Sequence, residues 1–376
     1  MRRIGLRRGS LAALAAACAT ALTVAACSSG SSSSPSAGGT ATATASGGSS
    51  ASASSTASLP TVTMMVGGID KQIYLPYQLA QSLGFYKKYG VNMQLSTEQA
   101  GGVGAEDAMA SGQVDFAGAW YVHTINFQLQ GKAVEDVAQL SGAPGERIMC
   151  ATGTHITSPT QWKGQSIGVT DLGSGTDQLT QYLAARYGLK HGTDYSTIAA
   201  GDGTTMIAAL QHHKILCGMT TQPTVAAIEK LGVGYPAFDL TTTAGVKKWL
   251  GGFVPTAGVL ALTSWVNSHQ DTVQKVVDAI VATMHWISTH SAADVANALP
   301  ASFVNNALVT KATYISTLST DKTQFLPDGV MPSSGPSVIM AISKLAGVIT
   351  GPVNLSTTYT NSFADNANKL LGFTTG

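Results

Sequence analysis

Residues 102–117, GVGAEDAMASGQVDFA, combine a glycine-rich loop, a short helical stretch, a tight turn and a short strand-like run. Residues 201–218, GDGTTMIAALQHHKILCG, repeat that order of segments. The repetition of one unit in both halves of the chain predicts two similar lobes. Because ligands bind at the carboxyl ends of the strands in open parallel sheets, the two glycine loops are expected to face each other across a ligand-binding cleft.

Strand-like and helical segments alternate on both sides of these two units. β-Rich runs bounded by glycine turns predict strands, and apolar residues at helical spacing predict helices. The alternation indicates parallel sheets, so the expected fold class is α/β with two lobes and parallel-rich sheets. Strands are expected at residues 61–66, 91–95, 114–117 and 166–170, and helices at 74–83, 105–111, 180–187, 272–287, 292–299 and 337–348.

Charged residues are scarce in this chain of 376 residues. They make up only 11% of it, whereas a typical soluble domain has about 25%. Four of the 21 Lys and Arg residues precede Cys27, which leaves 17 against 20 Asp and Glu, a net charge of −3. This balance argues against nucleic-acid binding, which needs a basic surface. No apolar run of about 20 residues follows Cys27, so no transmembrane helix is expected.

The first 26 residues have the pattern of an export signal. Arginines at positions 2, 3, 7 and 8 precede the alanine-rich apolar stretch Leu11–Ala26, and small residues before a cleavage point are typical of secretory signals. Residues 24–27, VAAC, resemble the bacterial lipobox, which implies that Cys27 is diacylated and becomes the mature N-terminus. The alternative is an ordinary signal peptide with a chance cysteine. The sequence leaves open whether export uses the Sec or the twin-arginine pathway.

Residues 28–58 contain only Ser, Gly, Ala and Thr with one Pro. A segment of this composition cannot bury apolar surface, so residues 27–59 are expected to form a lipidated, flexible tether in front of the folded body. The protein is then expected to be exported and lipid-anchored to the outer face of the cytoplasmic membrane.

Two cysteines, Cys150 and Cys217, remain in the body. In an oxidising compartment they can form a disulfide. The alternative is that each is buried separately as a small apolar side chain. No metal-ligand spacing accompanies either cysteine, and the adjacent His212 and His213 make a poor metal site because neighbouring side chains diverge. No metal or other cofactor is expected.

Several blocks, in this order along the chain, resemble a known protein family. They are residues 80–92, AQSLGFYKKYGVN, residues 108–117, AMASGQVDFA, residues 162–169, WKGQSIGV, residues 173–177, GSGTD, and residues 222–224, QPT. Together they resemble the periplasmic solute-binding proteins of ABC importers, of the nitrate/sulfonate/taurine and thiamine-pyrimidine-precursor type.

The resemblance implies a type II, Venus-flytrap fold of two lobes joined by two hinge crossovers. It implies that lobe I spans residues 60–147 and 253–376, including the C-terminal helices, and that lobe II spans 148–252. The crossings are expected near Arg147–Cys150 and Phe253–Leu262. The family further implies a monomer that binds a small solute without catalysis and serves an ABC permease and its ATPase.

The loop Gly173–Asp177 is a candidate anion site. Free backbone N–H groups at the start of a helix bind anions such as sulfonate or carboxylate, and Ser174 and Thr176 add hydroxyl groups. The alternative is that Ser174 or Thr176 only caps the helix and Asp177 stabilises its first turn. Both interpretations can hold together.

Other candidate ligand contacts lie on the loops that follow the expected strands. Aromatic side chains there offer an apolar face with a polar group, and the polar residues offer hydrogen bonds. For each of them a place in the core, in a turn or in solvent is the alternative. The complete set of candidate ligand contacts is Asp70, Gln72, Tyr74, Trp120, Tyr121, His123, Ser174, Gly175, Thr176, Asp202, Thr221 and Gln222.

The expected function is therefore solute binding for an ABC importer, with a sulfonate- or taurine-like anion favoured and a pyrimidine-type solute next. One alternative is an exported serine hydrolase that uses Ser166 in the G-x-S-x-G string of residues 164–168. That motif requires a strand before the serine and a helix after it, and here the order is reversed. A second alternative is a ligand-sensing partner of a membrane receptor.

Overall fold

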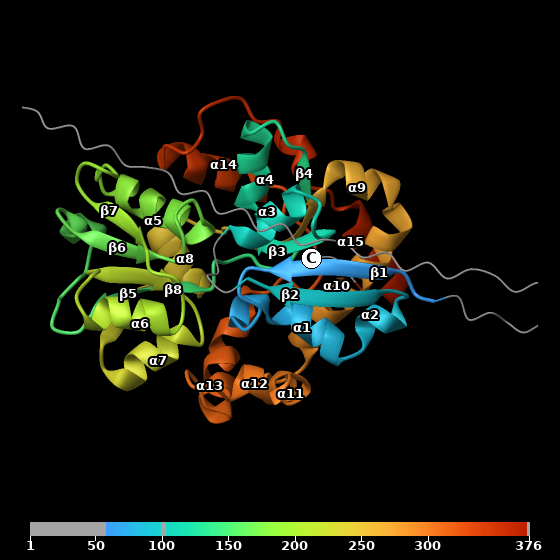
Figure 1. Cartoon of the computed structure of the whole chain (residues 1–376), viewed down its shortest axis with the longest axis horizontal. Helices are drawn as coiled ribbons and strands as arrows, with labels where there is room; N and C mark the ends of the chain where they lie inside the picture. Colours follow the sequence, from blue (N-terminus) through green and yellow to red (C-terminus); the bar gives the residue numbers. More distant parts are fainter. Residues whose placement is uncertain (1–57, 99–102, 374–376) are drawn as a thin grey trace, which may run out of the picture. The chain divides into compact units, whose positions relative to one another are not determined.

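The computed structural model describes residues 58–98 and 103–373. In this part of the chain the first five-stranded sheet has the order β2-β1-β3-β10-β4 (Figure 1). Its strands are β1 (Thr61–Val66), β2 (Asn92–Thr97), β3 (Phe116–Trp120), β4 (Val134–Gln139) and β10 (Ala257–Leu262). β1 pairs in parallel with β2 and β3, and β10 is antiparallel to β3 and β4. We call the part built around this sheet lobe I.

The second sheet, in lobe II, repeats this arrangement with the order β7-β6-β8-β5-β9. Its strands are β5 (Glu146–Ala151), β6 (Ser166–Val169), β7 (Ser196–Ala199), β8 (Cys217–Thr220) and β9 (Gly234–Leu240). β6 is parallel to β7 and β8, and β5 is antiparallel to β8 and β9. In each sheet, therefore, the fourth strand in the order, β10 or β5, runs opposite to the other four.

The repeated sequence unit forms equivalent elements in the two lobes. In lobe I, α3 (Gly104–Ala110) leads into β3, and in lobe II, α6 (Thr204–Gln211) leads into β8. The predicted α/β fold with two lobes is confirmed at this level. The other α-helices are α1 (Leu75–Ser82), α2 (Phe85–Lys88), α4 (Val122–Leu129), α5 (Gly175–Arg186), α7 (Thr224–Leu231), α8 (Thr243–Leu250), α9 (Thr263–Ser268), α10 (Gln270–Thr289), α11 (Ala292–Ala298), α12 (Ala301–Val304), α13 (Lys311–Asp321), α14 (Gly335–Leu345) and α15 (Ser362–Leu371). The short 3-10 helices are η1 (Gln72–Tyr74), η2 (Pro159–Trp162), η3 (Lys322–Gln324) and η4 (Leu355–Thr357).

Most predicted elements lie within a few residues of the observed ones, and two differ for local reasons. The strand expected at 114–117 begins at Phe116, because the carboxylate of Asp115 accepts a hydrogen bond from the backbone N–H of Thr63 (2.8 Å). The helix expected at 180–187 begins at Gly175, since the Ser174 hydroxyl caps it.

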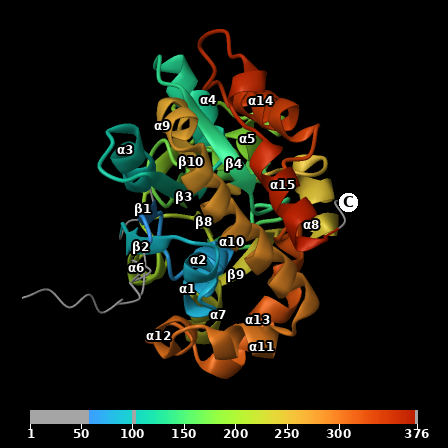
Figure 2. The ribbon, with the colours of Figure 1, turned by 90° about the vertical axis from the view of Figure 1, so that its right-hand side faces the viewer.

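The long helix α10 packs back on lobe I, as the sequence predicts. Its buried stripe includes Val273, Val276, Val277 and Ile280. This stripe is the reason that the helix lies against α1, α2 and α15 rather than in solvent (Figure 2). Lobe I is consequently built from segments at both ends of the described chain.

The chain passes between the two sheets twice, in the segments 140–145 and 251–256. The Oγ atoms of Ser141 and Thr256 lie 2.8 Å apart, so the two crossings are hydrogen-bonded to each other. The range Arg147–Cys150, where the first crossing was expected, lies inside β5. The chain therefore changes sheet a few residues earlier, at the glycines Gly142 and Gly145.

Cys150 and Cys217 form a disulfide between the directly opposed strands β5 and β8. Both side chains are fully buried.

The expectations for the signal segment, Cys27 and most of the tether concern residues outside the described ranges. No helix among the described residues is long and apolar enough to cross a membrane.

Candidate ligand-binding site

Three cavities lie in the crevice between the two lobes. We call them the wide cavity (about 890 Å³), the central cavity (about 20 Å³) and the side cavity (about 510 Å³). Lys71 lines both the wide and the central cavity, and Glu106 and His123 line both the central and the side cavity. The central cavity thus shares wall residues with each of the other two, and we call the three together the crevice.

The lobe I wall of the central cavity carries two of the expected aromatic residues. Tyr74 ends η1 and Trp120 ends β3, and both side chains are buried. His123, in the first turn of α4, also lines this cavity, and its Nε2 lies 2.8 Å from Oε1 of Glu106 on α3. The carboxylate of Glu106 fixes the ring of His123, so this histidine has a partner inside the site.

The lobe II wall is the turn between β6 and α5. Ser174 caps α5 by accepting a hydrogen bond from the backbone N–H of Asp177 (3.2 Å). The hydroxyl oxygens of Thr170, Ser174 and Thr176 lie 2.8–3.2 Å from one another, and all three residues line the central cavity. The N–H groups of Gly175 and Thr176 have no acceptor within the helix, because they belong to its first turn. The capping role and the cavity-lining role therefore coexist.

The two walls touch at Gly175. A Cβ atom there would lie 2.1 Å from Cε3 of Trp120, far inside van der Waals contact. Only glycine allows the start of α5 to approach the indole so closely. This contact between β3 of lobe I and α5 of lobe II places the lobes in a closed arrangement around the central cavity.

Glu146, the first residue of β5, contributes a buried carboxyl group to the central cavity. Burial raises the pKa of Glu146 to about 8, although the Lys71 ammonium group opposes the shift. Its Oε2 atom is buried without a hydrogen-bond partner, and the same is true of Oε2 of Glu106. At neutral pH the Glu146 carboxyl is mainly protonated, so it can donate a hydrogen bond as well as accept one.

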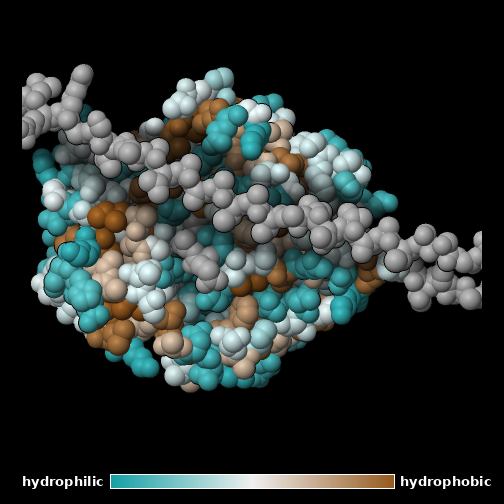
Figure 3. Space-filling model, in the orientation of Figure 1, coloured by the Kyte–Doolittle hydropathy of each residue, from teal (hydrophilic) through white to brown (hydrophobic). Residues whose placement is uncertain are grey.

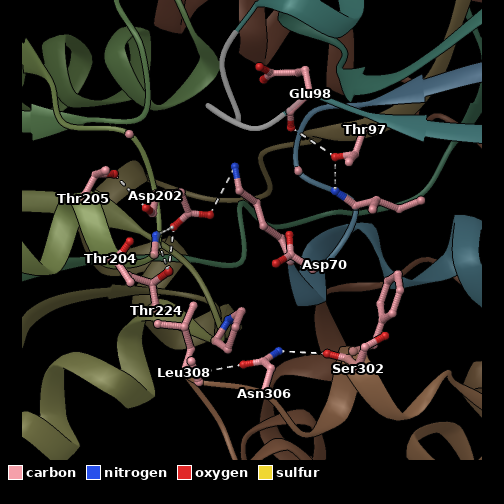
Figure 4. Close-up of a pocket in the computed structure, with 18 of the residues that line it drawn as sticks. Asp70, Thr97, Glu98, Asp202, Thr204, Thr205, Thr224, Ser302, Asn306 and Leu308 are labelled. Carbon is pink, nitrogen blue, oxygen red and sulfur yellow. Dashed lines mark hydrogen bonds and ion pairs between the residues drawn. The ribbon is translucent and has the colours of Figure 1, made fainter.

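An ion pair joins the lobes between the central and the wide cavity. Nζ of Lys71 in lobe I lies 3.5 Å from Oδ2 of Asp202 in lobe II. Asp202 also accepts hydrogen bonds from the hydroxyls of Thr220 (3.0 Å) and of Thr224 (2.6 Å), and the Thr224 contact is drawn in Figure 4. Burial alone would raise the pKa of Asp202, but Lys71 and these hydrogen bonds outweigh it and lower the pKa. Asp202 is therefore an anion held in place.

Six of the expected contact residues do not line the central cavity, and one of them is Asp202 in the wall of the wide cavity. Asp70 is exposed in the wall of the wide cavity (Figure 4). Gln72, Tyr121, Thr221 and Gln222 line none of the three cavities.

Those four side chains make structural hydrogen bonds. Gln72 Nε2 donates to the backbone oxygen of Tyr314 (3.2 Å), and the Tyr121 hydroxyl pairs with that of Thr358. Thr221 Oγ1 donates to the backbone oxygen of Gly145 (2.6 Å), and Gln222 Oε1 accepts from the N–H of Ala226 (3.2 Å). These contacts hold the hinge region and the core.

Sequence reasoning missed several residues that the fold brings to the crevice. Lys71 directly follows Asp70, and Glu106 lies in the quoted unit 102–117, so a search for buried charges on the strand-end loops could have found both. The wide cavity is also lined by the segment 302–308, which no local pattern connects to the glycine loops.

The described residues lining the three cavities are strongly acidic. Lys71 is the only Lys or Arg among them, whereas seven are Asp or Glu. The acidic residues are Asp70, Glu98, Glu106, Asp107, Glu146, Asp177 and Asp202. The crevice thus has an electrostatic character that attracts positive charge. On the face of the body seen in Figure 3, hydrophilic and hydrophobic residues are interspersed.

Ser166, the nucleophile of the alternative hydrolase interpretation, begins β6. Its Oγ lies 3.1 Å from the Oγ of Ser196 on the neighbouring strand β7. A strand follows the serine instead of a helix, so the geometry of a nucleophile elbow is not formed.

Similar proteins include binding proteins and enzymes. "Putative binding protein YtlA" of Bacillus subtilis is 23% identical over 232 residues, which cover 61% of this chain and 67% of that protein. The 4-amino-5-hydroxymethyl-2-methylpyrimidine phosphate synthase THI12 of Saccharomyces cerevisiae is 29% identical over 147 residues. That match covers 38% of this chain and 42% of the yeast protein, so it spans less than half of the enzyme.

Solved structures share the whole body. A protein from Bordetella bronchiseptica RB50 matches with a TM-score of 0.75 and 27% identity, covering 83% of this chain and 98% of that chain. The periplasmic nitrate-binding protein NrtA from Synechocystis PCC 6803 matches with a TM-score of 0.66 and 16% identity, covering 83% and 89%. The type II periplasmic-binding-protein fold expected from the sequence is thereby confirmed.

The family resemblance is confirmed as well. The model of the family described as NMT1/THI5 like matches residues 73–293, which include β2, β3, β4 and β10 of lobe I, all of the second sheet and all of α10. This match covers more than half of the chain, and the protein therefore belongs to the NMT1/THI5-like family.

Proposed function

We propose that this protein is the extracytoplasmic solute-binding component of an ABC importer. In this proposal Cys27 carries the lipid anchor, residues 28–58 tether the body, and the crevice between the lobes captures a small organic solute for a permease. The family membership, the two-lobed fold and the crevice lined from both lobes support it. The protein acts by binding and not by catalysis.

The solute carries a positively charged or hydrogen-bond-donating nitrogen group. The observation that carries this assignment is the pair of buried carboxyl groups, Glu106 and Glu146, in one cavity, each with an oxygen that has no partner. A nitrogen donor satisfies both oxygens, while a simple anion would face the Glu106 carboxylate, with Lys71 as the only Lys or Arg among the described residues that line the central cavity. Amines, amidines and aminopyrimidines have this chemistry.

A taurine-like zwitterion is the second candidate. Its ammonium group pairs with Glu106 and Glu146, and its sulfonate pairs with the hydroxyls and the free N–H groups at the start of α5, once the lobes open and enlarge the central cavity beyond its present volume of about 20 Å³. The sulfonate preference derived from the sequence is retained only in this form, since Ser174 and Thr176 face the same cavity as the two carboxyl groups.

The solute acts by favouring the closed arrangement of the lobes. Glu106, Tyr74 and Trp120 belong to lobe I, while Glu146, Ser174 and Thr176 belong to lobe II, so a molecule among them contacts both. A ligand that makes more contacts in the closed than in the open state shifts the population toward closure. The permease then recognises the closed form.

Isothermal titration calorimetry against amines, amidines, aminopyrimidines, taurine, alkanesulfonates and nitrate tests the proposal. We expect a nitrogen compound to bind, and Glu146→Gln or Glu106→Gln to weaken it by about 1–3 kcal/mol, the cost of an unmatched buried polar group. Glu229→Gln, an exposed acid on α7, is the control. Tight binding of nitrate or alkanesulfonates that is indifferent to both crevice variants would contradict the proposed solute class.

Two further measurements separate this function from the alternatives. Ser166→Ala is expected to leave function intact, and loss of a hydrolytic turnover in that variant would support an enzyme. Copurification with a permease supports import, whereas copurification with a membrane receptor supports sensing.

A further inference from the structure

Four residues that line the side cavity have buried oxygen atoms without a hydrogen-bond partner among the described residues, and three of these atoms, on Asn126, Asp177 and Gln178, are not used by the central site. The side cavity is lined by α3 and α4 of lobe I and by the start of α5 in lobe II. The four atoms are Oε2 of Glu106, Oδ1 of Asn126, Oδ1 of Asp177 and Oε1 of Gln178.

The other polar atoms of three of these side chains are already engaged. Glu106 Oε1 pairs with His123 Nε2 (2.8 Å), and Asp177 Oδ2 accepts from the N–H of Gly173 (2.8 Å). Gln178 Nε2 donates to the backbone oxygen of Gly173 (3.2 Å), which fixes the amide so that its oxygen is the atom left over. Glu106, Asp177 and Gln178 are each less than 5% exposed.

The three oxygens of Asn126, Asp177 and Gln178 define the chemistry of the occupant. Buried acceptors are matched by N–H or O–H donors, and the Asp177 oxygen belongs to a carboxylate, which favours a cationic donor. No three His, Cys, Asp or Glu side chains in the described ranges are grouped so as to hold a metal ion. A nitrogen group with several N–H bonds, such as ammonium or amidinium, therefore fits better than a metal ion.

We propose that the side cavity is a second nitrogen-binding station and that the solute has two nitrogen groups. One lies between Glu106 and Glu146 in the central cavity, and the other lies among Asn126, Asp177 and Gln178. The inference rests on the proposed function and specifies its solute. Because Asn126 is in lobe I and Asp177 in lobe II, the second group also bridges the lobes and adds to closure.

A matched series of diamines and monoamines tests the second station. The probes are 1,3-diaminopropane, 1,4-diaminobutane and 1,5-diaminopentane, each compared with the monoamine of equal length by isothermal titration calorimetry. For at least one length we expect the diamine to bind about tenfold or more tightly than its monoamine, the effect of one added charge-assisted contact.

Two variants assign that preference to the side cavity. Asn126→Leu removes one acceptor, and Asp177→Asn removes the charge while an amide oxygen can still accept from Gly173. Each is expected to abolish the diamine preference and to leave monoamine affinity unchanged. Asn267→Leu, an exposed residue on α9, is the matched control.

The possible failures are distinguishable. No diamine preference at any length, or a preference that survives both variants, would overturn the second station. The proposed function would still stand if a nitrogen compound bound in a manner that depends on Glu146. If no nitrogen compound bound with dependence on Glu146, the proposed function itself would fail.

Discussion

Two buried carboxyl groups, those of Glu146 and Asp136, have pKa values far above the usual range. Glu146 lines the central cavity, and Asp136 on β4 accepts hydrogen bonds from the N–H groups of Ala138 and Val259, both at 3.1 Å. Burial raises the pKa of Glu146 to about 8 and that of Asp136 to about 7. In the folded protein both groups hold a proton at pH values where the unfolded chain has lost it.

The free energy of unfolding is expected to fall as the pH rises from about 5 to 8. Since the folded state binds more protons than the unfolded state in this window, raising the pH favours unfolding. For Glu146 the full effect is roughly 5 kcal/mol at most. Urea unfolding at pH 5 and pH 8 measures it. Glu146→Gln should reduce the dependence to the part that Asp136 contributes, while Glu229→Gln should leave it unchanged. A stability that is constant over this range, or that rises, would contradict the buried neutral carboxyl.

Gly175→Ala tests the closed contact between the lobes. The added methyl group would lie where Trp120 now packs, so closure is hindered while the exposed surfaces are unchanged. We expect solute affinity to fall about tenfold or more, since overpacking costs about 1–3 kcal/mol. Titration calorimetry measures the affinity, and Trp120→Leu in the same chain should restore part of it. Unchanged affinity in the single variant would mean that the lobes close in another way.

At the scale of elements, α13 connects with both lobes. The Arg147 guanidinium on β5 of lobe II donates to both carboxylate oxygens of Asp321 at the end of α13, at 2.8 and 2.9 Å. Gln72 of lobe I donates to Tyr314 and Thr317 on the same helix, at 3.2 and 3.0 Å. The helix α13 therefore acts as a third connection beside the two crossings.

Removal of the α13 ion pair should destabilise the protein. Asp321→Ala leaves the Arg147 side chain, which is 11% exposed, without its main partner. Breaking a buried pair from one side costs about 3–5 kcal/mol. The loss is measured by urea unfolding, with Asp271→Ala on the exposed face of α10 as control. A loss below about 1 kcal/mol would show that the pair behaves like a surface salt bridge.

Local patterns in the sequence predicted the elements because each depends on neighbouring residues. The alternation of buried Val62, Met64 and Val66 defines β1, and the Ser174 cap defines the start of α5. The same reasoning could not predict that Asp321 meets Arg147 or that the segment 302–308 lines the wide cavity. Those contacts depend on how helices pack across more than 100 residues of chain.

The candidate site was predictable only in part, for the same reason. Tyr74, Trp120, His123 and the Ser174–Thr176 turn follow strands, and the strand ends converge by topology. Glu146 begins β5 in the second sheet, whereas the strand before Gly142 belongs to the first sheet. Its place in the cavity therefore follows from the crossing between the sheets. The acidic character of the crevice appears only when these segments are combined, and it changes the favoured solute from an anion to a nitrogen compound.

At the scale of the whole molecule, the disulfide stabilises lobe II without contacting the crevice. It joins β5 to β8 across 67 residues of chain. Replacing both cysteines by alanine is expected to lower the free energy of unfolding by about 4 kcal/mol, from the loop entropy regained by the unfolded chain. Solute affinity should remain within about threefold, since neither cysteine lines a cavity of the crevice. Unfolding with and without a reductant measures the first effect, and a stability that does not respond to either treatment would contradict it.

The position of β10 has a consequence for how the chain is made. This strand lies between β3 and β4 in the first sheet, yet the whole of lobe II separates it from β4 in the sequence. Lobe II is continuous and has all of its strands once residue 240 has been delivered. Lobe I must wait for residue 262, with the edges of β3 and β4 unpaired until then. On a chain that emerges from its N-terminus, the second lobe is therefore the first that can complete its sheet, and the strand edges that stay exposed longest are those of β3 and β4 in the first lobe.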